Sequence, residues 1–289
     1  MKPVRKAIFP VAGFGTRFLP ATKAVPKEML PVVDRPLIQY AVDEARAAGI
    51  EQMIFVTGRN KYAIEDYFDS AYEIESDLAA KNKTEFLDRL EATRLTPGHA
   101  AFIRQQQMLG LGHAVACARD LVGDEPFAVL LPDELLWNRA APCLQQMVET
   151  YEAKGGNVVA VLEVPEEHTH RYGIVDPGVS EGAVTEVRRM VEKPAAGTAP
   201  SRLAIVGRYI LQPEIFALLD KGERGAGGEI QLTDAMAKLI GSQAFHALTF
   251  DGERHDCGDN AGFIQANIAL ALERPELRES IQAFIKTLV

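Results

Sequence analysis

The stretch that decides the fold of this chain runs Val11-Ala-Gly-Phe-Gly-Thr-Arg-Phe-Leu-Pro-Ala-Thr-Lys-Ala-Val-Pro-Lys-Glu-Met-Leu-Pro31. It follows the apolar run 7–12, which predicts a buried first strand. Gly13 and Gly15 let the backbone turn tightly and bring its N–H groups close to a ligand. Residues 1–27 contain six Lys or Arg and no acidic residue, although the whole chain carries a net charge of −9. This local positive charge predicts that the ligand of the loop is a polyphosphate.

Two familiar phosphate-binding loops do not match this stretch. The P-loop pattern Gly-x-x-x-x-Gly-Lys-Ser/Thr is absent from the sequence. A Rossmann fingerprint needs a third glycine where this chain has Phe18, and Pro20 follows where a helix should be running. For the two glycines alone, an ordinary strand-to-loop turn with solvated lysines is the alternative.

Composition limits the class of protein. Of the 289 residues, 47% are hydrophobic and 25% are charged, as in ordinary globular proteins. No apolar run is long enough to span a membrane, and residues 1–6 show no secretory signal. The acidic balance argues against nucleic-acid binding. Three widely spaced cysteines, Cys117, Cys143 and Cys257, suggest a reducing compartment and no zinc cluster. We therefore expect a cytoplasmic protein without membrane or nucleic-acid partners.

Apolar strands alternate with helical patterns along the chain. The runs 52–58, 127–132 and 157–163 predict buried strands, and the segments 36–48 and 141–154 predict helices. Continuous apolar runs separated by helices are typical of a mostly parallel sheet that is covered on both faces. The fold class predicted is therefore α/β.

Three further segments complete the organisation. Residues 61–95 are predicted to form a helical insertion, and residues 173–212 to form strands and turns. The segment 275–289 predicts a helix whose apolar face contains Leu277, Ile281, Phe284, Ile285 and Leu288. We expect this face to pack inside the molecule, with a subunit contact as the alternative.

Two aspartates are candidate metal ligands. Asp133 follows the apolar run 127–132, and ligands of open α/β sheets bind beyond the carboxyl ends of the strands. Asp256 stands in Arg254-His-Asp-Cys-Gly258. Mg²⁺ takes one or two carboxylates and completes its shell with water and phosphate oxygens. A helix cap or a surface acid is the alternative for Asp133.

The string from Gly13 to Pro31 closely resembles the signature of the sugar-1-phosphate nucleotidyltransferases. The Thr-Lys pair at 22–23 and the Lys-Glu-Met-Leu-Pro at 27–31 resemble the bacterial members that use UTP and glucose 1-phosphate. The resemblance covers about residues 5–272, with the family's motifs in order. It implies a Rossmann-like nucleotide-diphospho-sugar transferase fold with a mixed, mostly parallel sheet. It also implies Mg²⁺-dependent transfer of uridylyl from UTP to glucose 1-phosphate by direct in-line displacement, giving UDP-glucose and pyrophosphate.

The resemblance also implies a role for individual residues. The nucleotide contacts would be Ala12, Gly13, Gly15, Thr16, Glu28, Gln105 and Gly110. The catalytic cations would be Arg17, Lys27 and Lys193, and the magnesium ligands Asp133 and Asp256. The sugar contacts would be Gly173, Glu192, Lys193 and Glu229. Without the resemblance, the short motifs around Lys193 and Glu229 would read as a surface turn and a helix start.

The glycine-rich segment 104–114 resembles the family's base-reading loop, which follows a short strand at 101–104 and opens a helix at 115–121. Uracil offers an N–H donor between two carbonyl acceptors. The amide of Gln105 has both a donor and an acceptor, but it can rotate. Fixed backbone groups at Ala12 and Gly110 would therefore have to set the polarity of the site.

We expect one nucleotidyltransferase domain over residues 1–289. The nucleotide part would span 1–135 with the insertion 61–95, the sugar part 136–272, and the C-terminal helix 273–289. A homodimer or homotetramer is expected by resemblance. Asn260 departs from the family, which commonly has a lysine there. The alternatives are a related enzyme for another nucleotide or sugar, a glycosyltransferase, whose Asp-x-Asp motif is absent, and a non-catalytic regulatory paralogue.

Overall fold

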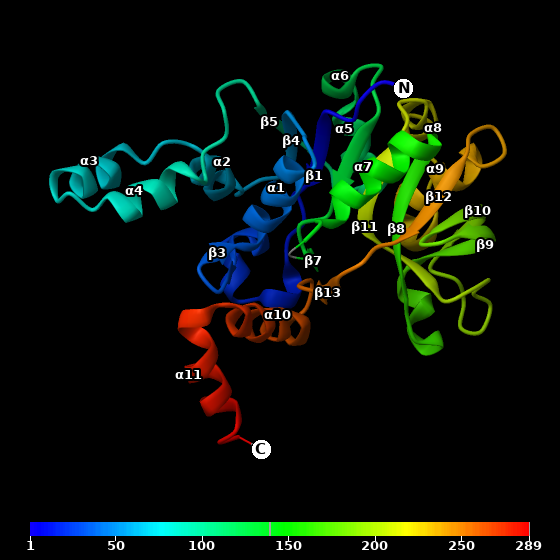
Figure 1. Cartoon of the computed structure of the whole chain (residues 1–289). Coiled ribbons are helices and arrows are strands. Elements are labelled where there is room, and N and C mark those ends of the chain that lie inside the picture. The colour runs from blue at the N-terminus through cyan, green and yellow to red at the C-terminus, as the bar shows by residue number, and fades with distance from the viewer. Residues whose placement is uncertain (139, 289) are drawn as a thin grey trace.

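The computed structural model describes residues 1–138 and 140–288, and Figure 1 shows its central sheet with helices on both sides. The sheet has nine strands in the order β5-β4-β1-β6-β11-β8-β12-β10-β9. Its strands are β1 (Lys6–Pro10), β4 (Gln52–Thr57), β5 (Ala100–Arg104), β6 (Phe127–Leu130), β8 (Asn157–Glu163), β9 (Gly173–Glu181), β10 (Val184–Glu192), β11 (Leu203–Leu211) and β12 (Phe245–Thr249). Two small ribbons pair β2 (Pro31–Val32) with β3 (Arg35–Pro36), and β7 (Glu134–Trp137) with β13 (Glu253–Asp256).

The helices fall between these strands as an α/β fold requires. They are α1 (Leu37–Ala47), α2 (Tyr62–Phe68), α3 (Tyr72–Ala80), α4 (Thr84–Glu91), α5 (Leu111–Cys117), α6 (Arg119–Val122), α7 (Cys143–Lys154), α8 (Ile215–Leu219), α9 (Leu232–Leu239), α10 (Asn260–Glu273) and α11 (Pro275–Ile285). Short 3-10 turns are η1 (Thr16–Phe18), η2 (Ala21–Lys23), η3 (Lys27–Met29), η4 (Glu166–Arg171) and η5 (Ala226–Gly228).

Alternate residues of each central strand enter two separate cores. In β1, Ile8 belongs to the core that includes Val115 of α5 and Met236 of α9. Its neighbour Phe9 belongs to the core on the other face, with residues of α1 and α7 such as Ile38 and Leu144. Because both faces are covered, most successive residues of the central strands are apolar, rather than every second one.

The sheet is mixed, and its two halves differ in strand direction. Strands β5, β4, β1 and β6 run parallel, whereas β11 runs antiparallel to both β6 and β8. The predicted α/β class is confirmed, and parallel pairing dominates the first half. Parallel strands end at the same edge, so the segments that follow β1, β4, β5 and β6 all emerge together.

Most predicted elements are confirmed within a few residues, and the run 157–163 matches β8. The prediction of a single helix at 115–121 is wrong, because the structure has two helices, α5 and α6, that are separated at Ala118. The N–H of Ala118 donates to the carbonyl of Val115, which tightens the last turn of α5 and ends it.

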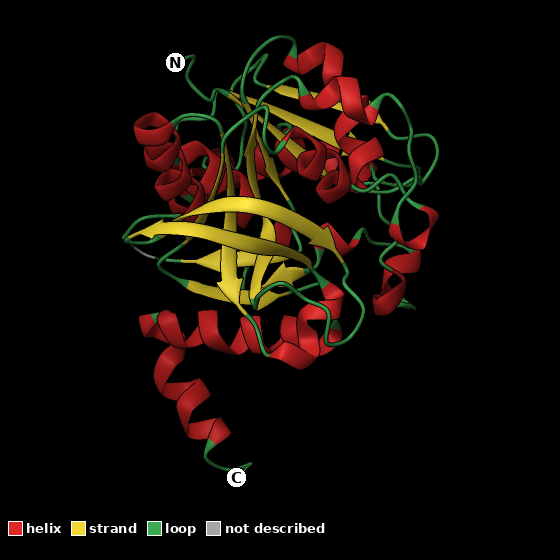
Figure 2. Ribbon diagram, turned by 90° about the vertical axis from the view of Figure 1, so that its right-hand side faces the viewer, coloured by secondary structure: helices red, strands yellow, loops and turns green. Residues whose placement is uncertain are grey.

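The prediction that the C-terminal apolar face packs inside the molecule is wrong. Helix α11 projects away from the sheet below α10 in Figure 2, and none of its residues is buried. Phe284 is 59% exposed and Leu288 is 69% exposed. Periodicity shows that a helix has an apolar face, but it does not show what covers that face.

The hairpin of α3 and α4, which we call the arm, projects to the left in Figure 1, on the side of the sheet away from β9 and β10. Neither of its helices contains a buried residue. In the part of the chain that the structure describes, no helix has both the length and the apolar character needed to cross a membrane.

Candidate active site

The loop after β1 folds back on itself through three 3-10 turns. Gly15 has φ = +65°, and a Cβ at this position would lie 3.1 Å from Cβ of Lys27 and 3.1 Å from Cγ2 of Thr22. The hydroxyl of Thr22 donates to the carbonyl of Gly15 at 2.8 Å. Only glycine suits this left-handed and crowded position. The tight turn places the start of the loop against Lys27 near its end.

Lys27 forms an ion pair across the edge of the sheet. Its Nζ lies 2.5 Å from Oδ2 of Asp133, which follows β6. Burial disfavours both charges, but attraction to Asp133 and Glu28 raises the pKa of Lys27. Burial alone would raise the pKa of Asp133, but the charge and hydrogen bond of Lys27 lower it below its usual value. Both groups are therefore charged at neutral pH, and the sequence-predicted cation and metal ligand are brought together.

Asp133, Asp256 and Arg17 converge beside Gly258. A Cβ at Gly258 would lie 2.9 Å from Oδ1 of Asp256, 3.4 Å from Oδ2 of Asp133 and 3.6 Å from Nη1 of Arg17. The N–H of Gly258 donates to Asp256 at 3.0 Å, and Arg17 donates to the carbonyl of Gly258 at 3.3 Å. The absence of a side chain at Gly258 thus leaves a small cradle edged by two carboxylates and a guanidinium.

This cradle opens into a cavity of about 440 Å³. Among its lining residues are seven that the sequence predicted: Arg17, Asp133, Gly173, Glu192, Lys193, Glu229 and Asp256. A Cβ at Gly173 would lie 2.9 Å from Oγ1 of Thr233 and 3.2 Å from Oε2 of Glu192, so the backbone can approach these two lining residues this closely only because residue 173 is glycine.

Lys193 adopts an uncommon backbone conformation at the cavity. Its φ is +46°, in the left-handed region that residues with a side chain rarely occupy. Its N–H donates to the carbonyl of Tyr172 at 2.9 Å, which ties the two lining segments together. Strain of this kind persists where the surrounding structure enforces it, and it is common at functional sites.

Sequence reasoning missed a partly buried charged cluster beside the same cavity, where Arg254 contacts the lining residue Glu134. Arg254 donates to Glu134 through Nε at 2.6 Å and through Nη2 at 2.8 Å, and its Nη2 lies 3.4 Å from Asp256. Its guanidinium also lies 5.1 Å from the ring centre of Tyr172. Burial raises the pKa of Glu134 although Arg254 opposes that effect. The only available sequence signal was adjacency, since both charged residues lie within two positions of a predicted metal ligand.

The backbone of the predicted base-reading loop packs against the backbone of residues 229–230. Gly110 has φ = +108°, and a Cβ there would lie 2.8 Å from the carbonyl oxygen of Ile230 and 2.8 Å from Cβ of Glu229. The N–H of Gly112 donates to the carbonyl of Ile230 at 2.8 Å. Gln105 is buried beside this loop, and its Nε2 donates to the carbonyl of Gly110 at 3.1 Å.

Glu28, another predicted nucleotide contact, is a charged residue that the structure buries. Only 1% of the residue is exposed, and Lys61 contacts its Oε2 at 2.6 Å. Burial raises the pKa of Glu28, whereas Lys61 and Lys27 act in the opposite direction. Lys61, which sequence reasoning also missed, holds the turn that carries Lys27.

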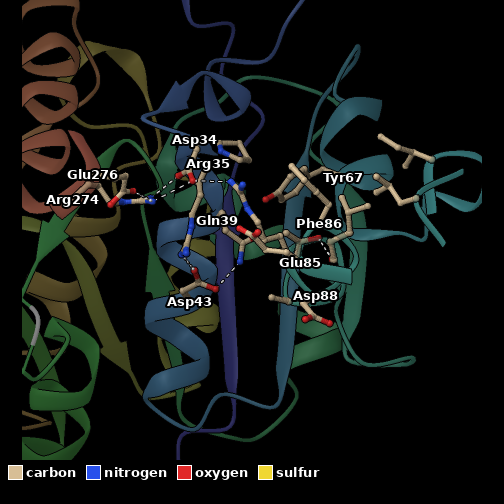
Figure 3. Close-up of a pocket in the computed structure, with 17 residues that line it drawn as sticks. Asp34, Arg35, Gln39, Asp43, Tyr67, Glu85, Phe86, Asp88, Arg274 and Glu276 are labelled. Atoms are coloured by element: carbon tan, nitrogen blue, oxygen red, sulfur yellow. Dashed lines mark hydrogen bonds and ion pairs between the residues drawn. The ribbon is translucent and has the colours of Figure 1, made fainter. Parts of the chain in front are cut away.

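Figure 3 shows a second and larger cavity, of about 900 Å³, between α1, the arm and the start of α11. Arg274 and Arg89 both pair with Asp34 at its edge. None of the predicted site residues lines this cavity. The chemistry of the side chains, rather than the size of the cavity, therefore identifies the candidate active site.

The fold and the site define an α/β protein that gathers cations and paired carboxylates beyond the carboxyl ends of its parallel strands. The sequence profile of the nucleotidyl transferase family matches residues 6–273, and the chain belongs to this family. The predicted family is confirmed, and the chain is a nucleotidyltransferase enzyme.

Individual relatives agree with this assignment. The UTP–glucose-1-phosphate uridylyltransferase of Bacillus subtilis (strain 168) is 53% identical over 290 residues, which cover 100% of this chain and 98% of that protein. The UTP-bound UGPase from Acinetobacter baumannii superposes with a TM-score of 0.91 at 42% identity, over 99% of this chain and 100% of that one. A UDP-glucose pyrophosphorylase complexed with UDP-glucose has a TM-score of 0.85 at 44% identity, over 94% and 100% of the two chains.

Proposed function

We propose that this enzyme transfers uridylyl from UTP to α-D-glucose 1-phosphate and releases UDP-glucose and pyrophosphate. The observation that carries the proposal is the convergence of Asp133, Asp256 and Arg17 on Gly258, at the mouth of a cavity whose wall contains Lys193. Relatives at 50–53% identity over the full chain carry the name of this activity.

The donor set of the cradle fits Mg²⁺. Two carboxylates point into one small space, and Mg²⁺ in nucleotide enzymes uses one or two carboxylates and completes its shell with phosphate oxygens and water. We therefore assign Asp133 and Asp256 as its protein ligands. Bound Mg²⁺ supplies charge neutralisation and orientation of the triphosphate oxygens. Since Lys27 now contacts the same oxygen of Asp133, its ammonium must share that carboxylate or turn toward the phosphates.

The proposed reaction is a direct in-line displacement. A phosphate oxygen of glucose 1-phosphate forms a bond to the α-phosphorus of UTP. The bond from that phosphorus to the oxygen bridging to the β-phosphate breaks, and pyrophosphate leaves with the electron pair. The attacking oxygen is already anionic at neutral pH, so no general base is needed. The protein has to bring two polyanions together and stabilise the leaving charge.

The cations divide this work according to their positions. Arg17, held at the cradle by the carbonyl of Gly258, is placed to steady the β- and γ-phosphates as they leave. Lys193 lines the cavity wall beside Gly173 and Glu192, where it would aim the incoming sugar phosphate. Lys27 lies against Asp133, where its charge faces the proposed metal ligand.

Pyrophosphate release tests this function directly. The purified enzyme is incubated with Mg²⁺ and glucose 1-phosphate, and UTP is compared with dTTP, CTP, ATP and GTP. We expect strong release with UTP that EDTA abolishes. Preference for another nucleotide would instead indicate a related enzyme of the family, and no release with any of them would favour a regulatory paralogue.

A homodimer or homotetramer and a cytoplasmic location are part of the same proposal. The exposed apolar residues of α11, with Phe284 the most exposed within the helix, support an assembly, and light scattering of the purified protein would measure its mass. The three cysteines are free thiols, which supports a reducing compartment.

A further inference from the structure

The amide of Gln105 is oriented by two acceptors. Its Nε2 lies 3.1 Å from the carbonyl oxygen of Gly110 and 2.9 Å from Nδ1 of His113. A carbonyl oxygen can only accept, so the side of the amide that faces Gly110 must be the NH₂ group. The two hydrogens of that group then go to Gly110 and His113. Nδ1 of His113 accepts the second one, which assigns the ring proton to Nε2.

The remaining polar atoms of the loop form one acceptor and one donor. In the described part of the chain, Oε1 of Gln105 has no hydrogen-bond partner. The carbonyl of Gly110 already accepts from Gln105 and from the N–H of Ala114 at 3.1 Å. The N–H of Gly110, by contrast, donates to none of the residues in the ranges 1–138 and 140–288. The loop therefore offers an oxygen that accepts and a backbone N–H that donates.

We propose that His113 is a positioning residue for nucleotide selection: it fixes the Gln105 amide so that Oε1 faces the base. The inference rests on the proposed function, because it assigns the neighbourhood of Gln105 and Gly110 to the nucleobase. His113 lies in the first turn of α5, and it would act through Gln105 without touching the base itself.

This arrangement of one acceptor and one donor matches the hydrogen-bonding edge of uracil but not that of cytosine. N3 of uracil carries a hydrogen, which Oε1 can accept, and the adjacent carbonyl can accept from Gly110. N3 of cytosine is an acceptor, so it would face Oε1 with no hydrogen between them. Rejection is strong when a mismatch leaves buried polar groups unpaired, and Gln105 is only 5% exposed. Thymine has the same edge as uracil, so this device does not separate UTP from dTTP.

Without His113, Gly110 alone would orient the amide. The loss of one neutral hydrogen bond corresponds to roughly a threefold to tenfold change in an equilibrium. We therefore expect His113→Ala to lower the preference for UTP over CTP by about that factor. The preference for UTP over dTTP should stay unchanged, because thymine presents the same edge as uracil. His113→Asn places an amide oxygen near the position of Nδ1 and should restore the preference for UTP over CTP.

The experiment measures two quantities for the wild type and both variants. The first is the binding of UTP and CTP by calorimetry without glucose 1-phosphate, and the second is kcat/KM for pyrophosphate release with UTP, CTP and dTTP. His99→Ala, at an exposed histidine in the loop before β5, is the matched control and should keep all ratios. A lower UTP-to-CTP ratio in His113→Ala, restored in His113→Asn, supports the inference.

Two results would overturn the inference while leaving the proposed function intact. One is an unchanged UTP-to-CTP ratio in a folded and active His113→Ala enzyme. The other is a parallel loss for UTP, CTP and dTTP in both variants, which would show that His113 only supports the fold. Failure of the proposed function is distinct from both, since it would appear as no turnover of UTP by the wild-type enzyme.

Discussion

Nζ of Lys27 lies 2.5 Å from Oδ2 of Asp133, which joins the loop after β1 to the residue cluster after β6. The two residues are 106 positions apart in the chain. Their pair sets the charge balance at the place where we propose that the triphosphate and its metal bind.

Replacing Lys27 should remove a preorganised cation from the reaction. We expect Lys27→Met to lower kcat by about 10²–10³-fold, as the loss of a charge-stabilising group does in other enzymes. Steady-state pyrophosphate release would measure this. Lys23→Met, which removes an exposed cation from the same loop, is the control and should change kcat little. Equal effects of both substitutions would show that only the general charge of the loop matters.

The same pair should stabilise the fold in a pH-dependent way. Because Lys27 lowers the pKa of Asp133 below its ordinary value of 3.8, this carboxylate contributes stability above 3.8 and loses it as the pH falls through the lowered value. In Lys27→Met the ionised Asp133 loses its partner. The deficit in Tm relative to the wild type should therefore be largest at neutral pH and shrink in acid. A deficit that is constant across this range would contradict the assignment.

Gly258 should be required for the metal site rather than for the fold. Its φ lies outside the left-handed region, so alanine fits the backbone, but the added Cβ would lie 2.9 Å from Oδ1 of Asp256. We expect Gly258→Ala to raise the Mg²⁺ concentration needed for half-maximal activity and to change Tm little. A magnesium titration of the activity, combined with a thermal melt, separates the two effects. A normal magnesium requirement would show that the cradle is not the metal site.

Arg254 should be needed chiefly to neutralise Glu134. Arg254→Met leaves a largely buried carboxylate without its partner, which costs at most about 3–5 kcal/mol in the free energy of unfolding. Adding Glu134→Gln to the same chain should recover much of that loss, because the uncompensated charge is removed as well. Urea unfolding of both variants measures this coupling. Removing the exposed pair of Arg202 and Glu163 is the control and should change stability little.

Cys257 should be chemically inert although it adjoins Asp256. Burial and the carboxylates nearby raise its pKa to about 12, so very little thiolate exists at neutral pH. We expect iodoacetamide to modify the partly exposed Cys117 well before Cys257 in the native enzyme, as read by mass spectrometry. The unfolded protein, in which all three thiols are accessible, is the control. Rapid native labelling of Cys257 would show that the metal-site segment opens.

Several features of this protein could be predicted from its residues alone. The predicted strand 157–163 matches β8, and its continuous apolar run 158–162 fits a strand that is buried on both faces. The glycines at 15 and 173 mark places where a Cβ would collide with a neighbour, and both lie in motifs that resemblance identified. Asp133 could be placed at the sheet edge because a polar residue follows a buried strand.

Sequence by itself thus determined the α/β class, the glycine-rich loop after β1 and the residue types from which the site is predicted, since these depend on local patterns. Only the tertiary structure decided which of these side chains come into contact. The pairing of Arg254 with Glu134 spans 120 positions, and the projection of α11 depends on the absence of a covering surface in the described chain. The orientation of the Gln105 amide was likewise open, because a rotatable group takes its polarity from neighbours that the fold brings to it.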